Sequence, residues 1–487
     1  MLFSSNIFLF LFLPVTLLGY YLLRKPYRNM FLLMMSLVFY AFGEPKFVVV
    51  MVTSIVFNYS MAILIDRLRV VSNKTRREAL SKALPLLRKA AMFLCVAANL
   101  SILFVYKYLN FFIENVNRFG LELSQLKIVL PLGISFFTFQ AMSYVIDVYR
   151  QDVKVQYRPH YVALYISFFP QLIAGPIVRY STIEEQMMSR TVTFDDFSEG
   201  MRRFLIGVSK KLLLANNMAV IADRAFGLPD AGRSVAYAWL GAIAYAFQIL
   251  FDFTGYSDMA IGLGRMFGFK FLENFNYPYI SKSITEFWRR WHISLGQWFR
   301  DYVYYPLGGS RVKTKSRLVF NLFVVWLLTG IWHGASWNFA LWGLMYFVVL
   351  VFEKFTGIPK RLKSRWARGC YRVFTLLCIL FGRVLFRADG ASAALRYAQS
   401  MFGLSGNALF SDVVILTLRD YWFFLLASLL CSTELFKWLR ERIDGSKRRY
   451  IRVAANTLTV MLYAFGFIWA VSFLVLGAHN PFIYFNF

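Results

Sequence analysis

The amino-acid sequence predicts an all-α fold, a polytopic membrane helical bundle of about eleven spans with broken and re-entrant helices around a central funnel or tunnel. Hydrophobic residues make up 58% of the 487 residues and charged residues only 16%, whereas about a quarter of a soluble domain is charged. Apolar runs recur along the whole chain, and a span needs about 20 residues to cross the hydrocarbon core. Because no hydrophilic stretch is long enough to fold alone, we expect one membrane-embedded domain over residues 1–487.

The positive charge of the chain lies between the apolar runs. The net charge is +28, from 54 Lys and Arg against 26 Asp and Glu. The basic clusters occupy residues 24–28, 67–89, 311–317, 360–372 and 437–452. The positive-inside rule explains this loop placement without a nucleic-acid partner. We therefore expect a multi-pass protein of the inner, or plasma, membrane whose basic loops face the cytoplasm and whose surroundings are the lipid bilayer.

The N-terminal spans, residues 1–106, alternate cleanly between apolar runs and loops. Spans 7–23 and 47–65 are expected to cross from the outside to the cytoplasm, and spans 30–43 and 90–106 to cross back to the outside. This threading puts the first two basic clusters on the cytoplasmic side, as the rule requires.

The central part, residues 107–352, loses this alternation. Gly, Pro and polar residues interrupt the apolar stretches at 130–150, 168–180 and 251–268. Irregular backbone at membrane depth survives only where protein or a water-filled cavity satisfies its polar groups. The composition therefore predicts broken helices around an interior chamber, followed by C-terminal spans over 353–487.

A histidine lies within the apolar run 318–352. His333 stands in the string W-L-L-T-G-I-W-H-G-A-S-W-N. The basic clusters at both ends of the run predict a tight hairpin with both ends in the cytoplasm. An ionisable side chain in hydrocarbon marks a functional site by default, and imidazole has its ordinary pKa near neutrality. We interpret His333 as a buried base.

A second histidine, His292, lies in the segment 284–310. Helical spacing sorts this segment into an apolar stripe and a charged side, which predicts one amphipathic helix at the membrane interface. The stripe holds Phe287, Trp291, Leu295 and Trp298, and the charged side holds Glu286, Arg289, Arg290 and Arg300. His292 is either a second catalytic or gating group or an interfacial histidine that is hydrogen-bonded to a neighbour.

Two acids occur in the string F-D-F-T-G-Y-S-D. Asp252 and Asp258 either line the chamber or form ion pairs with Arg265 or Arg289. The four cysteines form no C-x-x-C pair, so we expect neither zinc nor disulfides.

Several strings together resemble the membrane-bound O-acyltransferase (MBOAT) superfamily. They are F-W-R-R-W-H-I-S-L at 287–295, R-D-Y-V-Y-Y-P-L-G-G at 300–309 and G-I-W-H-G-A at 330–335. The strings at 130–140, 251–262 and 273–279 and the terminal N-P-F-I-Y-F-N-F are similar to the bacterial branch that O-acetylates exported polysaccharides such as alginate. One departure is Asn216, where that branch is expected to have Asp.

The resemblance implies that His333 and His292 are the two signature histidines of a catalytic core within 107–352. It also implies an acyl thioester donor, acetyl-CoA or an acyl carrier protein, and no bound cofactor or metal. The expected partner is an extracytoplasmic acetyltransferase or a small membrane protein that completes transfer to the polysaccharide. The residues that we expect to contact substrate are Trp332, Trp337, Asn338, Trp288, Arg289, Asp252 and Asp258.

Other functions stay open at this point. D-alanyl transfer to teichoic acid would use the same motifs. A proton-coupled transporter without acyl transfer would also need broken helices and buried histidines. A scaffold for a secreted acetyltransferase would need no catalytic histidine.

Overall fold

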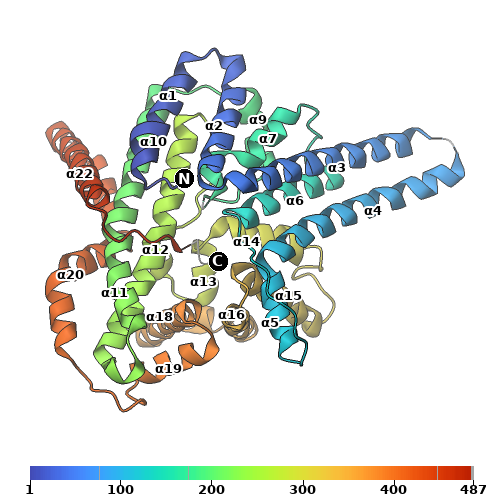
Figure 1. The fold of residues 1–487 in the computed structure, drawn as a ribbon. Coiled ribbons are helices and arrows are strands. Elements are labelled where there is room, and N and C mark those ends of the chain that lie inside the picture. Colours follow the sequence, from blue (N-terminus) through green and yellow to red (C-terminus); the bar gives the residue numbers. More distant parts are fainter. Residues whose placement is uncertain (76, 174, 447, 484–487) are drawn as a thin grey trace. The chain divides into compact units, whose positions relative to one another are not determined.

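The computed structural model describes residues 1–75, 77–173, 175–446 and 448–483 of the chain (Figure 1). These residues form helices and loops and no strand, which confirms the all-α membrane fold. Arg76 of the second basic loop and the last four residues of the terminal motif lie outside the described residues. Two compact units are present, Met1–Met201 with Ala260–Leu272 and Arg202–Met259 with Glu273–Phe487. The single membrane-embedded domain stays a prediction.

Nine helical segments among the described residues are long and apolar enough to cross a membrane. They are Pro45–Lys74, Glu78–Asn117, Phe194–Gly227, Val235–Met266, Lys315–His333, Trp337–Thr356, Arg365–Arg387, Asp412–Cys431 and Arg449–Val475. Two of the spans expected at the N-terminus are shorter, because the apolar helix Phe8–Leu22 and the 16-residue α2 fall below the ~20 residues of a full span.

The first unit is built mainly from the N-terminal helices. They are α1 (Leu13–Leu22), α2 (Arg28–Gly43), α3 (Val48–Lys74), α4 (Glu78–Leu103), α5 (Leu109–Asn117), α6 (Ile134–Arg150), α7 (Pro159–Ser167), α8 (Phe169–Leu172) and α9 (Tyr180–Met188). α3 and α4 form a long hairpin, and the buried amides of Asn58 and Asn99 hydrogen-bond each other across it at 2.8 and 3.1 Å. Polar pairs of this kind join helices in a membrane.

Of the three expected breaks in the central region, the one at 168–180 is confirmed, whereas at 130–150 the irregular residues precede Ile134 and the rest forms the continuous helix α6. Gly133, with φ +75°, starts α6 in a left-handed conformation that favours glycine. α7 ends at Ser167, the single turn of α8 follows, and the residues described between Leu172 and Tyr180 are not helical. These short elements are largely buried within the first unit.

The third expected break, at 251–268, is wrong. These residues lie almost entirely within one continuous helix, α12 (Val235–Met266). Its glycines serve close packing instead: a Cβ on Gly207 of α10 (Phe194–Ser209) would meet the Gly255 carbonyl oxygen at 2.6 Å. Small residues let two helix backbones approach closely, so here glycine marks a helix crossing.

The second unit contains the remaining helices and parts of α10 and α12. Its further elements are the π-helical η5 (Lys210–Ala215) and η8 (Arg300–Tyr304), α11 (Asn216–Gly227), α13 (Ile284–Arg290), α14 (Ile293–Phe299), α15 (Lys315–His333), α16 (Trp337–Thr356), α17 (Ile358–Arg361), α18 (Arg365–Arg387), α19 (Ala391–Met401), α20 (Asp412–Cys431), α21 (Leu435–Asp444) and α22 (Arg449–Val475).

The single amphipathic helix expected over 284–310 is wrong. The segment forms α13 and α14, with Trp291 and His292 between them, and then η8. All four residues of the expected apolar stripe are nevertheless buried, at 6% exposure or less. The periodicity therefore identified the buried side of the segment, while the break at His292 depends on contacts from elsewhere in the unit.

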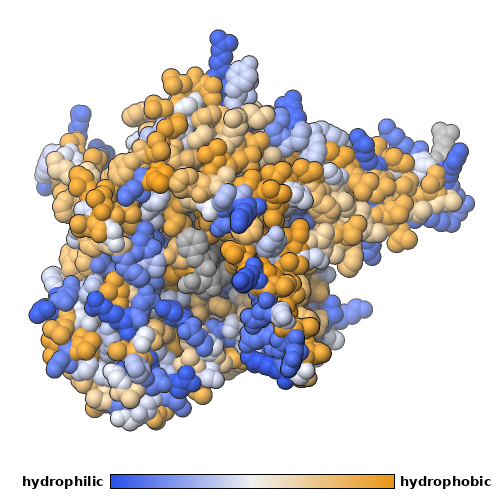
Figure 2. Space-filling model, in the orientation of Figure 1, coloured by the Kyte–Doolittle hydropathy of each residue, from blue (hydrophilic) through white to orange (hydrophobic). Residues whose placement is uncertain are grey.

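The exterior of the candidate spans is apolar. Figure 2 shows hydrophobic residues over much of the visible surface, including the α3–α4 hairpin, whose tip is hydrophilic. Large apolar side chains such as Val348, Leu426 and Ile468 are 61, 45 and 68% exposed. Exposed apolar surface of this extent is what a lipid-facing helix presents.

Candidate functional site

A helical hairpin carries His333 at its turn. α15 ends at His333 and α16 begins at Trp337, so the hairpin predicted for 318–352 is confirmed. The two helices pack backbone to backbone, because a Cβ on Gly330 or on Gly343 would collide with a carbonyl oxygen of the other helix. This close crossing fixes the position of the turn.

Three aromatic rings enclose the side chain of His333, which is 6% exposed. The ring centroids of Trp332, Trp342 and Phe386 lie 4.9, 5.0 and 5.3 Å from the imidazole centroid, each at a steep angle to it. The rings come from α15, α16 and α18, so three helices together determine the orientation of the histidine.

Trp332 also contacts the second histidine. Its ring centroid lies 6.1 Å from that of His292, with 76° between the planes. One indole therefore packs edge to face against both signature histidines, which are 41 positions apart in the sequence. The expectation that Trp332 contributes to the site agrees with this placement.

His292 occupies the break between α13 and α14 in a left-handed conformation, with φ +46° and ψ +53°. Such a conformation is uncommon for a residue with a Cβ and needs support from its surroundings. Asn274 gives that support: its carbonyl oxygen accepts from the Ile293 N–H at 2.9 Å, and its side-chain oxygen accepts from the N–H and hydroxyl of Ser294. The string at 273–279 thus holds the histidine loop.

The imidazole of His292 is 2% exposed and lies beside the rings of Phe253 and Phe275. Burial disfavours the charged form and lowers the pKa of His292 to about 3. His292 is therefore neutral throughout the physiological pH range.

Glu353 of α16 anchors the start of α13. Its carboxylate accepts from the backbone N–H groups of Ile284 and Thr285 at 2.8 Å each, and from the hydroxyl of Tyr371 at 2.8 Å. A carboxylate at a helix N-terminus satisfies otherwise unpaired N–H groups and interacts favourably with the helix dipole. This contact joins the helix that leads to His292 with the hairpin that carries His333.

Three other expected site residues are placed differently. Trp337 is 55% exposed, which argues against the expectation that it walls the histidine pocket. Asn338 is buried, and its amide donates to the carbonyl oxygens of Leu385 and Ala388 at the end of α18. Arg289 is exposed.

Trp288 lies within an aromatic cluster beside the site. Its ring centroid is 4.7 Å from that of Trp326, 4.9 Å from that of Tyr346 and 5.4 Å from that of Trp342. Because Trp342 also contacts His333, Trp288 supports the enclosure through Trp342.

Asp258 and Asp252 are both ion-paired, although with other partners than the expected Arg265 and Arg289. Asp258 accepts from Arg203 at 2.9 Å and from Lys210 at 2.7 Å. Arg265 instead lies beside Asp196 in the first unit.

Asp252 forms a fully buried ion pair with Lys211. The two charged atoms are 2.7 Å apart, and both side chains are 1% exposed. The C-terminal tail completes the pair, because the Pro481 carbonyl oxygen accepts from Lys211 and the Ile483 N–H donates to Asp252. Both acids therefore form ion pairs, as one of the two expectations had it, but their partners are Lys211 for Asp252 and Lys210 with Arg203 for Asp258.

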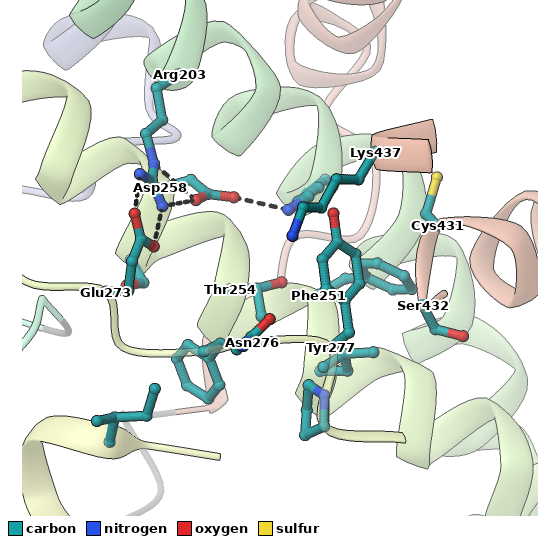
Figure 3. Close-up of a pocket in the computed structure, with 16 residues that line it drawn as sticks. Arg203, Phe251, Thr254, Asp258, Glu273, Asn276, Tyr277, Cys431, Ser432 and Lys437 are labelled. Carbon is teal, nitrogen blue, oxygen red and sulfur yellow. Dashed lines mark hydrogen bonds and ion pairs between the residues drawn. The ribbon is translucent and has the colours of Figure 1, made fainter. Parts of the chain in front are cut away.

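A cavity of about 460 Å³ lies beside the Asp258 cluster (Figure 3). Arg203, Lys210 and Asp258 line one side, and Lys437 and Tyr277 line another. In Figure 3 the ion-paired side chains of Arg203, Asp258 and Glu273 lie together on one side of the cavity, and Lys437 and Tyr277 lie on the other. Ile293, the neighbour of His292, also lines the cavity. A polar cavity with cationic groups therefore reaches the loop of one signature histidine.

Sequence reasoning missed Arg383. Its guanidinium carbon lies 4.0 Å from the ring centroid of Trp291, and the side chain is 1% exposed. An arginine within the apolar run of α18 was a readable signal, since buried charges in spans are rare and functional. Its partner could not be read from the sequence, because Trp291 lies about ninety positions away.

Comparison with known proteins gives a consistent assignment. Residues 81–358 match the membrane-bound O-acyltransferase family. The chain is 44% identical to the probable alginate O-acetylase of Pseudomonas aeruginosa over 411 residues, which cover 82% of this chain and 75% of the relative. It is 36% identical to the peptidoglycan O-acetyltransferase of Helicobacter pylori, over 84% of this chain and 81% of the relative.

A more distant relative is the teichoic acid D-alanyltransferase of Bacillus subtilis, at 32% identity over 52% of this chain and 68% of the relative. The resemblance inferred from the histidine strings is thereby confirmed. The chain belongs to the membrane-bound O-acyltransferase family and is a multi-pass membrane acyltransferase.

Proposed function

We propose that the protein transfers an acetyl group from a thioester donor at the cytoplasmic face to a hydroxyl acceptor, for O-acetylation of an extracytoplasmic cell-envelope polysaccharide. The observation that carries this proposal is the contact of Trp332 with both His292 and His333 in a chain of this family. Alginate and peptidoglycan O-acetylation are the activities in the names of the relatives that match over most of the chain. The D-alanyltransferase matches over only about half of it.

The proposed chemistry assigns the general base to His333. Its neutral imidazole accepts the proton of the acceptor hydroxyl while that oxygen attacks the thioester carbonyl carbon. The carbon–sulfur bond then breaks, and the imidazolium returns the proton to the departing thiolate. The products are an ester and a thiol, so no cofactor or metal is consumed.

The positive-inside rule assigns sides to this reaction. The basic clusters at 311–317 and 360–372 lie at the outer ends of the α15–α16 hairpin, so the turn with His333 points away from the cytoplasm. Lys437, the first residue of the basic cluster at 437–452, lines the cavity of Figure 3. The donor is therefore proposed to enter this cavity, where the ammonium group of Lys437 suits a phosphate of coenzyme A or of a carrier-protein prosthetic group.

His292 has a positioning or gating role in this proposal. Its neighbour Ile293 lines the proposed donor cavity, and its ring packs against Trp332, which also contacts the proposed base His333. The protein is proposed to act in the inner membrane of the cell. An extracytoplasmic acetyltransferase or a small membrane protein then completes transfer of the acetyl group to the polymer.

The test uses the purified full chain in lipid nanodiscs with acetyl-CoA and a hydroxyl acceptor. His333→Ala should lower release of free coenzyme A by at least ~10²-fold. His160→Ala, at a partly exposed histidine, is the matched control and should leave turnover unchanged. Thermal unfolding of each variant checks that the protein is folded.

Two outcomes would overturn the proposal. A transporter would release no coenzyme A from donor with or without His333. A scaffold for a separate acetyltransferase would support the same turnover with His333→Ala as with the unaltered protein.

A further inference from the structure

Arg383 of α18 is a buried cation near the end of a candidate span. Its side chain is 1% exposed, although Arg387, the last residue of the helix, lies only one turn further on. Long cationic side chains near the ends of spans usually extend toward the membrane interface and keep their charge in water. Arg387 follows this pattern, because it is 33% exposed and donates to Asp223 at 2.8 Å. The inward position of Arg383 therefore depends on an interaction within the second unit.

Aromatic rings supply that interaction. The guanidinium carbon of Arg383 lies 4.0 Å from the ring centroid of Trp291 and 5.7 Å from that of Phe287. The Nε and Nη2 atoms of Arg383 have no hydrogen-bond partner among the residues that the structure describes. A cation is attracted to the face of a ring most strongly when both are removed from water, and Trp is the best partner for such a contact. The ring of Trp291 is therefore the main partner of this charge.

Trp291 is the residue directly before His292. Its N–H donates to the Phe287 carbonyl oxygen at 2.9 Å where α13 ends, and His292 follows in its left-handed conformation. The Trp291 ring is 3% exposed and nearly parallel to the rings of Phe287 and Tyr279, with 20° and 12° between the planes. Arg383 contacts two rings of this stack. Its guanidinium therefore restrains the backbone from which the His292 side chain starts.

The next turn of α18 contacts the other histidine. Phe386, three residues after Arg383, packs on His333 with ring centroids 5.3 Å apart. Residues that are three apart in a helix lie on the same side of it. One helix thus places a ring against His333 and a cation against the residue before His292. This gives the two histidine segments a common support in addition to their shared contact with Trp332.

We propose that Arg383 is a positioning residue, whose cation–π contact with Trp291 holds His292 in the arrangement that acyl transfer requires. The inference rests on the proposed function, in which His292 has a positioning or gating role. Arg383 acts through Trp291 and the backbone, so weakening the contact displaces His292 without removing a group that binds the donor. The loss should therefore appear in kcat, with little change in the KM for acetyl-CoA.

The test varies the strength of the contact while keeping its shape. In the full chain in nanodiscs, Trp291 is replaced site-specifically by tryptophan with an increasing number of ring fluorines. Each fluorine withdraws electron density from the ring face and weakens its attraction for a cation. The kcat for coenzyme A release should fall stepwise, by about tenfold over the series. In Arg383→Leu the same series should have no effect on kcat, because no cation is left above the ring.

Controls separate positioning from packing. Arg233→Gln removes another buried guanidinium, 4.4 Å from the Tyr397 ring, and should lower the unfolding temperature while leaving kcat unchanged. The fluorine series at Trp239, whose ring packs on Phe381, should also leave kcat unchanged. Arg383→Lys keeps a cation and should retain more activity than Arg383→Leu. Equal losses in these two variants would contradict a role for the charge.

NMR of selectively ¹⁵N-labelled histidine gives a second readout that needs no turnover. The chain has four histidines, and His292→Gln assigns the signals of His292. The ring nitrogen shifts of His292 should change along the fluorine series at Trp291 and should not change in Arg233→Gln. Because this series keeps Arg383, it remains valid if Arg383→Leu does not fold.

Two results would overturn the proposal. One is a kcat that does not depend on fluorination of Trp291, and the other is a set of His292 shifts that does not depend on it. If the unaltered protein releases no coenzyme A, the acyl-transfer proposal fails, and the histidine shifts alone then decide whether Arg383 positions His292.

Discussion

Trp332 and His292 pack edge to face, with ring centroids 6.1 Å apart, although they lie on separate segments of the second unit. The same indole is 4.9 Å from His333. Edge-to-face aromatic pairs contribute about 0.5–1.5 kcal/mol beyond the area that they bury. Trp332 is thus the side chain that contacts both histidines directly, in addition to the link that Glu353 makes between their helices.

Replacing Trp332 should therefore disturb catalysis more than folding. Trp332→Leu removes both edge contacts and is expected to lower turnover about tenfold, a loss of ~1.4 kcal/mol. Trp332→Phe keeps an aromatic edge and should lose less. Coenzyme A release by the purified variants measures the effect. Trp337→Leu, at an exposed tryptophan, is the control, and an equal loss in both leucine variants would contradict the prediction.

The buried histidine His292 predicts a pH dependence of stability. Its pKa is about 3 in the folded protein and near 6.5 when solvated, so the unfolded chain binds the extra proton between these values. Stability should fall as the pH drops below 6.5, by up to ~1.4 kcal/mol per pH unit from this group. Thermal unfolding of the protein and of His292→Gln, between pH 7.5 and 5, tests this. Equal slopes in both proteins would show that His292 does not contribute.

The pair of Lys211 and Asp252 should be costly to break and partly recoverable. Lys211→Met leaves the Asp252 carboxylate buried without its cation, which is expected to cost about 3–5 kcal/mol. Adding Asp252→Asn removes the remaining charge while keeping an acceptor for the Ile483 N–H, so the double variant should be more stable than Lys211→Met alone. Unfolding in mixed micelles measures both. The idea fails if the double variant is the less stable one.

The α15–α16 crossing should not tolerate a methyl group. Gly343→Ala places a Cβ against the Trp326 carbonyl oxygen and should destabilise the protein by about 1–3 kcal/mol, with a matching loss of turnover as His333 moves. Gly369→Ala is the control: its Cβ meets no atom within 4 Å in α18, and it should stabilise by about 0.5–1 kcal/mol. Comparison of the two unfolding temperatures checks the prediction, which requires shifts of opposite sign.

Lys437 at the rim of the Figure 3 cavity should affect the donor alone. Lys437→Gln is expected to raise the KM for acetyl-CoA about fivefold, or ~1 kcal/mol, and to leave the acceptor dependence unchanged. Lys354→Gln removes the same charge from the exposed end of α16 and should have no effect. A change in kcat without a change in KM for donor would place Lys437 outside the donor path.

The helices and the histidines were readable from the sequence because each depends on local pattern. The apolar runs predict spans by length, and the two basic clusters around 318–352 predict the hairpin of His333. A histidine in an apolar run is a local anomaly, and the surrounding strings identify the family. Burial of Phe287 and Trp291 also follows from helical spacing.

Features that depend on distant contacts could not be read in this way. Gly255 was interpreted as a break, and only the approach of Gly207 makes it a helix crossing. His292 adopts its left-handed conformation because Asn274 hydrogen-bonds the residues that follow it, and Asp258 selects Lys210 because η5 and α12 lie side by side. Trp337 and Asn338 are adjacent in the sequence, yet Trp337 is exposed, whereas Asn338 is buried and donates to a carbonyl oxygen at the end of α18.

The sequence by itself determined that the chain is a helical membrane acyltransferase with two signature histidines, since composition, periodicity and motif are properties of short stretches of chain. The tertiary structure alone decided which aromatic rings enclose those histidines, which lysines neutralise the buried acids and where the cavity opens. Each of these depends on side chains brought together across dozens to hundreds of positions, and close packing in three dimensions selects such partners without leaving a local trace in the sequence.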